Sequence, residues 1–293
     1  LLSAVPQIGE IAQITAEQLV NIGSQDIDEE IWIKLSCRVN ELLNCDDIDG
    51  IVITHGTDTM EESAFFLQLT TNSTKAVVLT GAMRPSTSLS ADGPLNLYNA
   101  VAVAACDDAS DRGVMVTMNN SIFSATDVTK MHTTDIDAFQ APENGKIGSI
   151  TGSKVTFNTP PYHHTLTFPI KDGIKLPKVG IVYSYGGIDP DMVTFMIENK
   201  YRGIVHAGVG NGNIHKNIFP ILEEGAREGI LIVRSSRVAA GPVTLENEVD
   251  DNKYHFVASQ GLNPQKSRIL LMLSLTKTHN WEEVQRYFNM FVL

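Results

Sequence analysis

The sequence predicts an α/β protein of two domains, each built on a parallel sheet. Short apolar runs alternate with longer amphipathic segments, which is the pattern of repeated βαβ units. The 293 residues exceed the length at which a single hydrophobic core usually stops growing. Residues 158–177 contain four prolines and no sustained periodicity, so we interpret them as an interdomain linker. The predicted domains are therefore 1–157 and 178–293.

The first predicted domain contains three strands and at least two helices. The strands are apolar on both faces, as parallel strands buried between layers of helices are, and they span 50–54, 76–80 and 113–118. Residues 28–43 are predicted as a helix because apolar side chains recur there at helical spacing. A second helix is predicted over 92–105, with Asp92 as its cap and Pro94 in its first turn.

The same alternation resumes after the linker and predicts a smaller α/β domain. Its strands are expected at 179–183, 203–208 and 230–233. Its helices are expected at 191–199, 216–228, 264–278 and 281–291.

Charge and cysteine usage exclude several classes of function. The chain has 34 acidic and 22 basic residues, a net charge of −12, which disfavours binding to nucleic acid and to anionic membranes. Apolar stretches such as 269–273 are far shorter than the roughly 20 residues of a membrane span. Cys37, Cys45 and Cys106 form no CxxC pair, so neither a metal site nor a disulfide framework is predicted.

The first candidate site follows the strand at 50–54, where the sequence THGTDTMEE occupies 54–62. Open α/β sheets place their chemistry where a strand turns into a helix, and such a turn leaves backbone N–H groups free. Thr57 and Asp58 are therefore candidates for catalysis. The alternative is helix capping, because Asp58 with Glu61, and Thr59 with Glu62, match the capping-box pattern.

Four further residues are weaker candidates. Lys130 follows the strand at 113–118 and is expected near Thr57, although most lysines are solvated surface charges. Ser24 and Gln25 are expected at the end of another strand, where they could hold a ligand carboxylate, or simply cap a turn. Glu248, in an acidic loop, is a candidate partner for a ligand ammonium or is only solvated.

The glycine-rich run GVGNGN at 208–213 fails as a dinucleotide-binding fingerprint. The third glycine of GxGxxG is replaced by Asn213, and no ribose-binding acid follows at the expected distance. We therefore expect no nicotinamide cofactor, and a tight turn that presents Asn211 or Asn213.

Taken together, several motifs resemble the bacterial L-asparaginases, particularly their type II branch. In the first half these are NIGSQD at 21–26, ITHGTDTMEE at 53–62, GAMRPSTSLSADGPLNLYNA at 81–100 and DVTK at 127–130. In the second half they are HAGVGNGN at 206–213, VRSSRV at 233–238, EVDD at 248–251 and LNPQKSRILL at 262–271. Independent motifs in the family's order make a chance match very improbable.

The resemblance implies a fold, an activity and a set of roles. The fold would be a flavodoxin-like N-domain with a smaller Rossmann-like C-domain, and the activity hydrolysis of L-asparagine without a cofactor. Thr57, Lys130 and Asp58 would form a hydrogen-bonded triad. Ser24 and Gln25 would hold the α-carboxylate and α-amino end of the substrate, and Asp58 would also take its ammonium. Asn213 and Glu248 would come from a neighbouring subunit of a homotetramer.

Two departures from the family pattern bear on these implications. The family's first strand ends in a glycine-glycine-threonine turn, whose threonine is the primary nucleophile, followed by a lid with a tyrosine. The sequence starts at Leu1-Leu2-Ser3, which matches the family beyond that lid, so we expect these parts to lie outside the 293 residues. Cys45 lies near one half of a disulfide of some periplasmic relatives, but 71–75 holds no cysteine. A periplasmic location thus rests on the resemblance, and a cytoplasmic one stays open.

Two rival functions remain open at this point. A glutaminase-asparaginase of broad specificity is close, because one methylene in a small pocket is worth only about 1–3 kcal/mol of discrimination. A non-catalytic amino-acid-binding protein would follow if the N-terminal nucleophile were truly absent.

Overall fold

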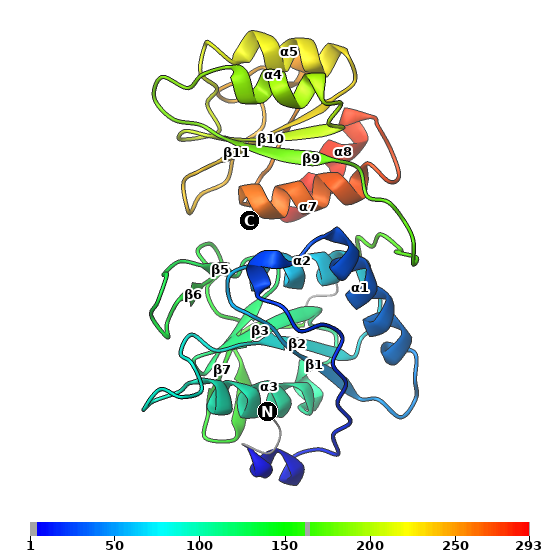
Figure 1. Cartoon of the computed structure of the whole chain (residues 1–293), viewed down its shortest axis with the longest axis vertical. Coiled ribbons are helices and arrows are strands. Elements are labelled where there is room, and N and C mark those ends of the chain that lie inside the picture. The colour runs from blue at the N-terminus through cyan, green and yellow to red at the C-terminus, as the bar shows by residue number, and fades with distance from the viewer. Residues whose placement is uncertain (1–4, 162–164, 293) are drawn as a thin grey trace. The chain divides into compact units, whose positions relative to one another are not determined.

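The computed structural model describes residues 5–161 and 165–292, and the chain divides into two compact units, Leu1–Ile174 and Lys175–Leu293 (Figure 1). The division falls inside the stretch 158–177 interpreted as a linker, of which 162–164 lie outside the described residues, as do 1–4 and 293 at the ends of the predicted domains. The stretch is not wholly separate from the first unit. Phe168 is buried, and its amide donates to the Leu69 carbonyl at 2.8 Å.

The first unit is built on a six-stranded mixed sheet of order β1-β2-β3-β4-β7-β8. Three neighbouring strands are parallel: β1 (Gly50–Thr54), β2 (Ala76–Thr80) and β3 (Val114–Met118). Three antiparallel strands extend it: β4 (Ser121–Ser124), β7 (Gly148–Thr151) and β8 (Lys154–Phe157). A separate ribbon pairs β5 (Thr129–Lys130) with β6 (Phe139–Gln140).

The predicted parallel strands are present, and the antiparallel strands extend the sheet beyond them. Asn119 and Asn120 both have positive φ, 47° and 58°, and turn the chain back directly after β3. Asparagine tolerates this left-handed backbone, and two such residues in a row are typical of a tight hairpin turn. The strands that follow are too short and too polar at their ends to stand out as apolar runs.

Helices cover both faces of this sheet (Figure 1). Helices α1 (Glu29–Leu43) and α2 (Met60–Thr70) pack on one face, and α3 (Gly93–Ala104) packs on the other. Side chains of β2 alternate between the layers: Val77 and Leu79 join the cluster with α1 and α2, whereas Ala76 and Val78 join the cluster with α3. Burial on both faces explains why these strands are apolar throughout.

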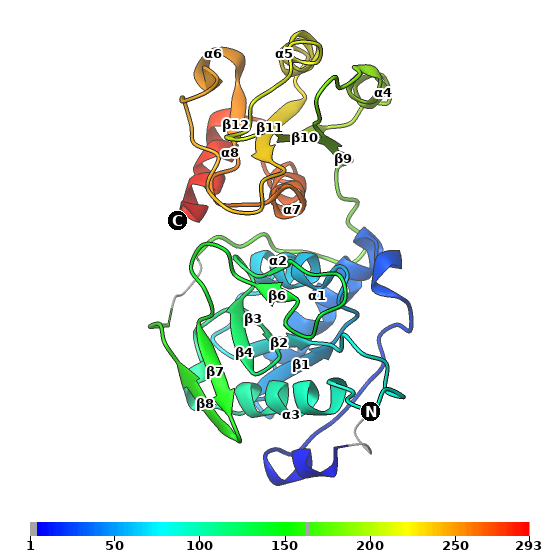
Figure 2. The ribbon, with the colours of Figure 1, turned by 90° about the vertical axis from the view of Figure 1, so that its left-hand side faces the viewer.

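The second unit has a four-stranded parallel sheet of order β12-β11-β10-β9. The strands are β9 (Val179–Tyr183), β10 (Gly203–Gly208), β11 (Leu231–Ser236) and β12 (Phe256–Ala258). Helices α4 (Asp191–Glu198) and α5 (Phe219–Arg227) cover one face, and α7 (Pro264–Ser274) and α8 (Trp281–Phe288) the other (Figure 2). A short helix, α6 (Asp251–Tyr254), precedes β12.

Several expected boundaries differ from the structure. No strand precedes Ser24 among residues 5–23; the segment Ser24–Asp26 is a single 3-10 turn. The helix expected at 216–228 begins only at Phe219, with Pro220 in its first turn, and the one expected at 264–278 ends at Ser274. The last helix ends at Phe288 and continues as the 3-10 turn Asn289–Phe291. β12 and α6 were not predicted.

Among the described residues, no helix is long and apolar enough to cross a bilayer.

Candidate active site

The first candidate site lies where β1 ends. Strands β1 and β2 are in register up to Thr54 and Thr80, and the His55 amide then donates to the Thr80 carbonyl at 2.8 Å. The loop that follows packs so closely at two positions that neither has room for a side chain. A Cβ added at Gly56 would lie 2.6 Å from Ser24 Oγ. A Cβ at Gly81 would lie 2.4 Å from the His55 carbonyl oxygen. Glycine is therefore required at both positions.

Two neighbouring side chains of this loop, Thr57 and Asp58, meet a third, Lys130, from a distant part of the sequence. Lys130 Nζ lies 2.9 Å from Thr57 Oγ1 and 2.6 Å from Asp58 Oδ1. The lysine side chain is 15% exposed, whereas the Asp58 side chain is 60% exposed. Lys130 is thus held on the protein side of the cluster, and the Asp58 carboxylate faces solvent, as a site for a small polar ligand requires.

The backbone of Lys130 is held independently of its side chain. Lys130 pairs with the buried Phe139 in the β5–β6 ribbon, and its amide donates to Glu61 Oε2 at 2.6 Å. Glu61 lies in the first turn of α2, directly after the Thr57 loop. This contact ties the ribbon to the helix that carries the loop, so the ammonium group and the hydroxyl group are positioned by the same element.

The capping alternative for Thr57 and Asp58 is wrong. Thr59 occupies the N-cap position of α2 but makes no side-chain capping bond; its hydroxyl donates to the Ser24 carbonyl at 2.7 Å. The Asp58 carboxylate contacts Lys130, and Glu61 accepts from the Lys130 amide. Tertiary contacts have replaced the local bonds that the motif predicts. The expected cap Asp92 is similar: it precedes α3, but its carboxylate accepts from the amides of Met83 and Arg84.

Ser24 lies against the same loop, and Gln25 lies next to it. Ser24 is buried, and its Oγ accepts from the Asp58 amide at 3.2 Å, which leaves the hydroxyl proton available to a ligand. Gln25 is exposed, and its amide group donates to Asp26 Oδ2 at 3.3 Å. The structure therefore brings Ser24, Thr57, Asp58 and Lys130 together.

Asn213 and Glu248 belong to the second unit, on two loops that share one anchor. The turn 209–213 is closed by backbone bonds between Val209 and Asn213, and Gly210 and Gly212 have positive φ of 53° and 71°. The glycines thus serve the turn itself, as expected. The Asn211 side chain is engaged with Thr244, which leaves Asn213 as the residue that the turn presents. Glu248 is exposed.

The shared anchor is a buried ion pair between Arg234 and Asp251, both 0% exposed. Arg234 Nε and Nη2 contact the two carboxylate oxygens at 2.5 and 2.6 Å. The guanidinium group also donates to the carbonyls of Asn211, at 3.3 Å, and Thr244, at 3.1 Å, while Asp251 accepts from the Glu246 amide. The pair therefore joins the turn that carries Asn213 to the loop that carries Glu248. Both residues lie inside family motifs, VRSSRV and EVDD, but no role had been predicted for either.

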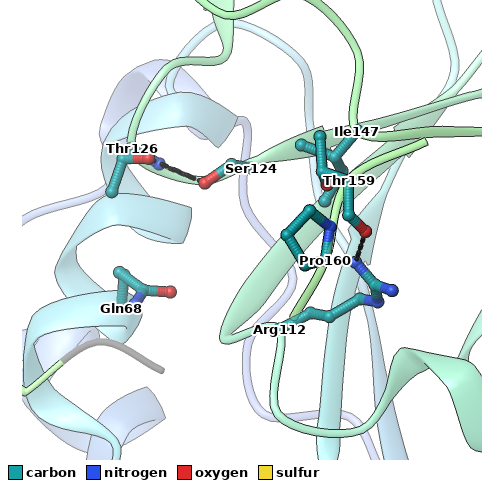
Figure 3. A pocket seen from close by; sticks show the side chains of 7 residues that line it. All are labelled: Gln68, Arg112, Ser124, Thr126, Ile147, Thr159 and Pro160. Carbon is teal, nitrogen blue, oxygen red and sulfur yellow. Dashed lines mark hydrogen bonds between the residues drawn. The ribbon is translucent and has the colours of Figure 1, made fainter. Parts of the chain in front are cut away.

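A small cavity elsewhere in the first unit does not compete as a substrate site. Its volume of about 50 Å³ has room for roughly three water molecules. Its polar lining is largely self-satisfied: Arg112 donates to the Thr159 carbonyl, and Ser124 bonds Thr126 (Figure 3). Among the described residues, no group of three or more His, Cys, Asp or Glu side chains could hold a metal ion.

Comparison with known proteins covers nearly the whole chain. A family model described as Asparaginase, N-terminal, matches residues 1–163, and one described as Glutaminase/Asparaginase C-terminal domain matches 178–288. The chain is 49% identical over 294 residues to L-asparaginase 2 of Escherichia coli (strain K12), which covers 99% of this chain and 84% of the relative.

Two further relatives carry different names. The chain is 50% identical over 294 residues to Probable L-asparaginase periplasmic of Haemophilus influenzae, covering 99% of this chain and 84% of that protein. It is 45% identical over 292 residues to Glutaminase-asparaginase of Pseudomonas fluorescens biotype A, covering 98% of this chain and 80% of that protein.

Proposed function

This chain belongs to the asparaginase family, and we propose that its Thr57, Lys130 and Asp58 side chains hydrolyse the side-chain amide of L-asparagine to L-aspartate and ammonia. The observation that carries the proposal is the position of Lys130 Nζ, within hydrogen-bond distance of both the Thr57 hydroxyl and the Asp58 carboxylate. A hydroxyl is a weak nucleophile until a neighbouring base takes its proton, and a lysine in its amine form is such a base.

The proposed reaction proceeds in two steps. A threonine oxygen attacks the amide carbon while its proton moves to Lys130 Nζ; Thr57 is the hydroxyl that Lys130 contacts here. The proton then passes to the leaving nitrogen, which departs as ammonia and leaves an ester. A water molecule attacks this ester, gives its proton through the same lysine, and releases aspartate. Asp58 stabilises the ammonium form of Lys130 between the transfers.

The developing negative charge on the substrate oxygen needs a donor. The backbone N–H of Thr57 has no hydrogen-bond partner among residues 5–161 and 165–292, whereas that of Asp58 donates to Ser24. We assign the Thr57 N–H to the oxyanion. One such preorganised donor is worth roughly 3 kcal/mol in known enzymes.

Substrate recognition follows from the zwitterionic end of asparagine. The Ser24 hydroxyl and the exposed Gln25 amide would bind the α-carboxylate and the α-amino end, and the exposed oxygen of Asp58 would accept from the α-ammonium. Asn213 and Glu248 would complete the ammonium site from a neighbouring subunit of a homotetramer, as the family resemblance implies. A periplasmic location is proposed because one relative is named periplasmic.

Glutamine is the second candidate substrate, since three relatives that are 42–45% identical are named glutaminase-asparaginase. The two amides differ by one methylene, which a small pocket discriminates by only about 1–3 kcal/mol. Values of kcat/KM for both substrates decide between them. We expect asparagine to exceed glutamine, and near-equal values would establish the broader specificity.

The test of the activity combines two measurements on the full-length protein. Ammonia release from L-asparagine reports turnover, and calorimetry with L-aspartate reports occupation of the zwitterion site. We expect both. Aspartate binding without ammonia release would instead establish a non-catalytic amino-acid-binding protein and overturn the proposal.

A further inference from the structure

A chain of hydrogen bonds runs from the interior of the first unit to the peptide that precedes Thr57. The indole Nε1 of Trp32, in α1, lies 2.8 Å from Ser63 Oγ, in α2. The same oxygen lies 2.8 Å from His55 Nε2, and His55 Nδ1 lies 2.5 Å from the Gly56 carbonyl oxygen. None of these contacts belongs to the triad.

The chemistry of the donors fixes where every proton in this chain lies. The Gly56 carbonyl can only accept, so His55 Nδ1 carries the proton of that contact. In a neutral ring the other nitrogen, Nε2, is then an acceptor, and it takes the hydroxyl proton of Ser63. An indole N–H can only donate, so Ser63 Oγ also accepts from Trp32. The direction of the chain is therefore set at the Gly56 carbonyl, and Trp32 holds Ser63 in place.

The inner part of the chain is buried, and the surroundings favour a neutral ring. Trp32 and Ser63 are buried, and the indole stacks on Phe66 with ring centroids 5.3 Å apart. Burial lowers the pKa of His55, against the opposing effect of its bond to the Gly56 carbonyl. This direction favours the uncharged form that the proton order requires.

We propose that His55 is a positioning residue that holds, through its Nδ1–H, the Gly56–Thr57 peptide in the orientation needed for the Thr57 hydroxyl and N–H to act. This inference rests on the proposed function. The carbonyl that accepts from His55 belongs to the same peptide as the Thr57 N–H, so the bond both orients that group and polarises it as a donor. Gly56 and Gly81, which pack closely at this loop, have no side chains that could orient the peptide.

Three substitutions separate the donor from the bulk of the ring. Asparagine places its amide near the Nδ1 position, so His55→Asn keeps a donor to Gly56. Glutamine reaches the Nε2 position instead, so His55→Gln meets Ser63 and loses Gly56, and His55→Leu loses both. We expect kcat for asparagine to fall about 100-fold in His55→Gln and His55→Leu, the loss that a misplacement near 1 Å causes. His55→Asn should stay within about tenfold of wild type, and KM should change less than kcat.

A matched histidine controls for general effects of the substitution. His255 is exposed and has φ of 56°, a conformation that asparagine tolerates, so His255→Asn should leave kcat unchanged. If all three His55 variants lose activity equally while remaining folded by thermal unfolding, or if none loses it, the positioning role is refuted.

A second measurement is independent of turnover and separates this inference from the proposed function. Two-bond ¹⁵N–¹H correlation spectra of protein labelled at histidine show which ring nitrogen carries the proton. We expect the Nδ1–H form of His55 in the wild type, and the same form in Ser63→Ala, because the Gly56 carbonyl still requires a donor. An Nε2–H ring or an imidazolium in the wild type would overturn the inference, even if asparagine is hydrolysed. Absence of ammonia release with the Nδ1–H form intact would refute the proposed activity alone.

Discussion

In each unit, a buried or partly buried cation is paired with an aspartate, as Lys130 with Asp58 and Arg234 with Asp251, and these two pairs are built in opposite ways. In the first unit, Lys130 contacts one oxygen of Asp58 at 2.6 Å, and the carboxylate is 60% exposed. In the second, Arg234 contacts both oxygens of Asp251, and both side chains are 0% exposed. The Lys130–Asp58 contact is monodentate and partly exposed, and we call it the open pair. The Arg234–Asp251 contact is bidentate and fully buried, and we call it the sealed pair.

The difference follows from what each cation is able to do. A guanidinium group does not lose its proton in proteins and binds a carboxylate through a planar fork, which suits a permanent anchor. An ammonium group is a point charge on a flexible stem and can give up its proton. The open pair therefore suits proton transfer to a ligand, and the buried pair suits fixing the loops that carry Asn213 and Glu248.

The largest expected effect tests the open pair. Lys130→Met keeps the unbranched side chain up to its fourth atom but removes the amine that acts as the base. We therefore expect kcat for asparagine to fall by about 10³- to 10⁴-fold, the upper range for proton transfer by a positioned group. The fold should remain intact, as judged by circular dichroism. The exposed Lys154→Met is the matched control and should retain full activity. An unchanged rate in Lys130→Met would remove this lysine from the mechanism.

The next effect tests the sealed pair. Arg234→Met leaves the charge of the buried Asp251 carboxylate without a cation, which we expect to lower the free energy of unfolding by about 4 kcal/mol in a denaturant titration. Arg227→Met, at the exposed pair with Glu223, should change it by less than about 1 kcal/mol. Equal effects of the two substitutions would show that burial does not distinguish the pairs.

A pH dependence of stability is expected from His206, which lies beside the sealed pair. His206 lies on β10 directly beside Arg234 of β11, is 0% exposed, and has no hydrogen-bond partner on either ring nitrogen among the described residues. Burial first, and then the Arg234 charge, lowers the pKa of His206 from 6.5 to about 4. The folded state thus keeps this ring neutral over a range in which the unfolded state takes up a proton.

The sign of the effect follows from proton linkage. Above pH 6.5, His206 does not lower the free energy of unfolding. As the pH falls from 6.5 towards 4, the unfolded state takes up a proton that the buried ring does not, and the free energy of unfolding decreases by about 3 kcal/mol in total. His206→Phe should remove this part of the acid sensitivity, measured as the free energy of unfolding at pH 7.5 and pH 4.5. His255→Asn should not. The same acid slope in wild type and His206→Phe would contradict a buried neutral ring.

The smallest effect returns to the open pair. Exposed ion pairs contribute at most about 1 kcal/mol to stability, because solvent screens the charges. We therefore expect Asp58→Asn to change the free energy of unfolding by no more than that, although it breaks a contact of 2.6 Å. A loss as large as that of Arg234→Met would mean that the triad is structural, and the contrast between the two regions would fail.

Much of the parallel framework was predictable because it depends on local patterns. Strands β1, β2, β9 and β10 have the predicted bounds, since strands buried on both faces are apolar runs bounded by polar or glycine-rich turns. The antiparallel strands after Asn119 were missed because they are short and mixed in polarity. Helix ends were misplaced by a few residues, as at Ser274, where the amphipathic pattern outlasts the helix.

The site residues, too, were only partly predictable from the sequence. Thr57 and Asp58 stood out by position, at the end of a strand, but spacing alone equally allowed a capping box. Lys130 is separated from Thr57 by 73 residues; its position after a strand placed it at the same sheet edge, but only the family resemblance gave it a role. His55 lies inside the motif at 53–62 but was given no role, and Ser63 and Trp32 lie outside the quoted motifs, because a histidine after a strand and a serine inside a helix are ordinary in sequence.

By itself, the sequence determined the alternation of strands and helices, the two-domain α/β class and the family, because periodicity and contiguous motifs are properties of short stretches of chain. The tertiary structure alone decided which polar groups use their hydrogen bonds on one another. Asp58 and Glu61 contact Lys130 instead of capping helix α2, and Arg234 contacts Asp251, because long-range contacts compete with local ones. The outcome of that competition depends on distances that no stretch of sequence contains.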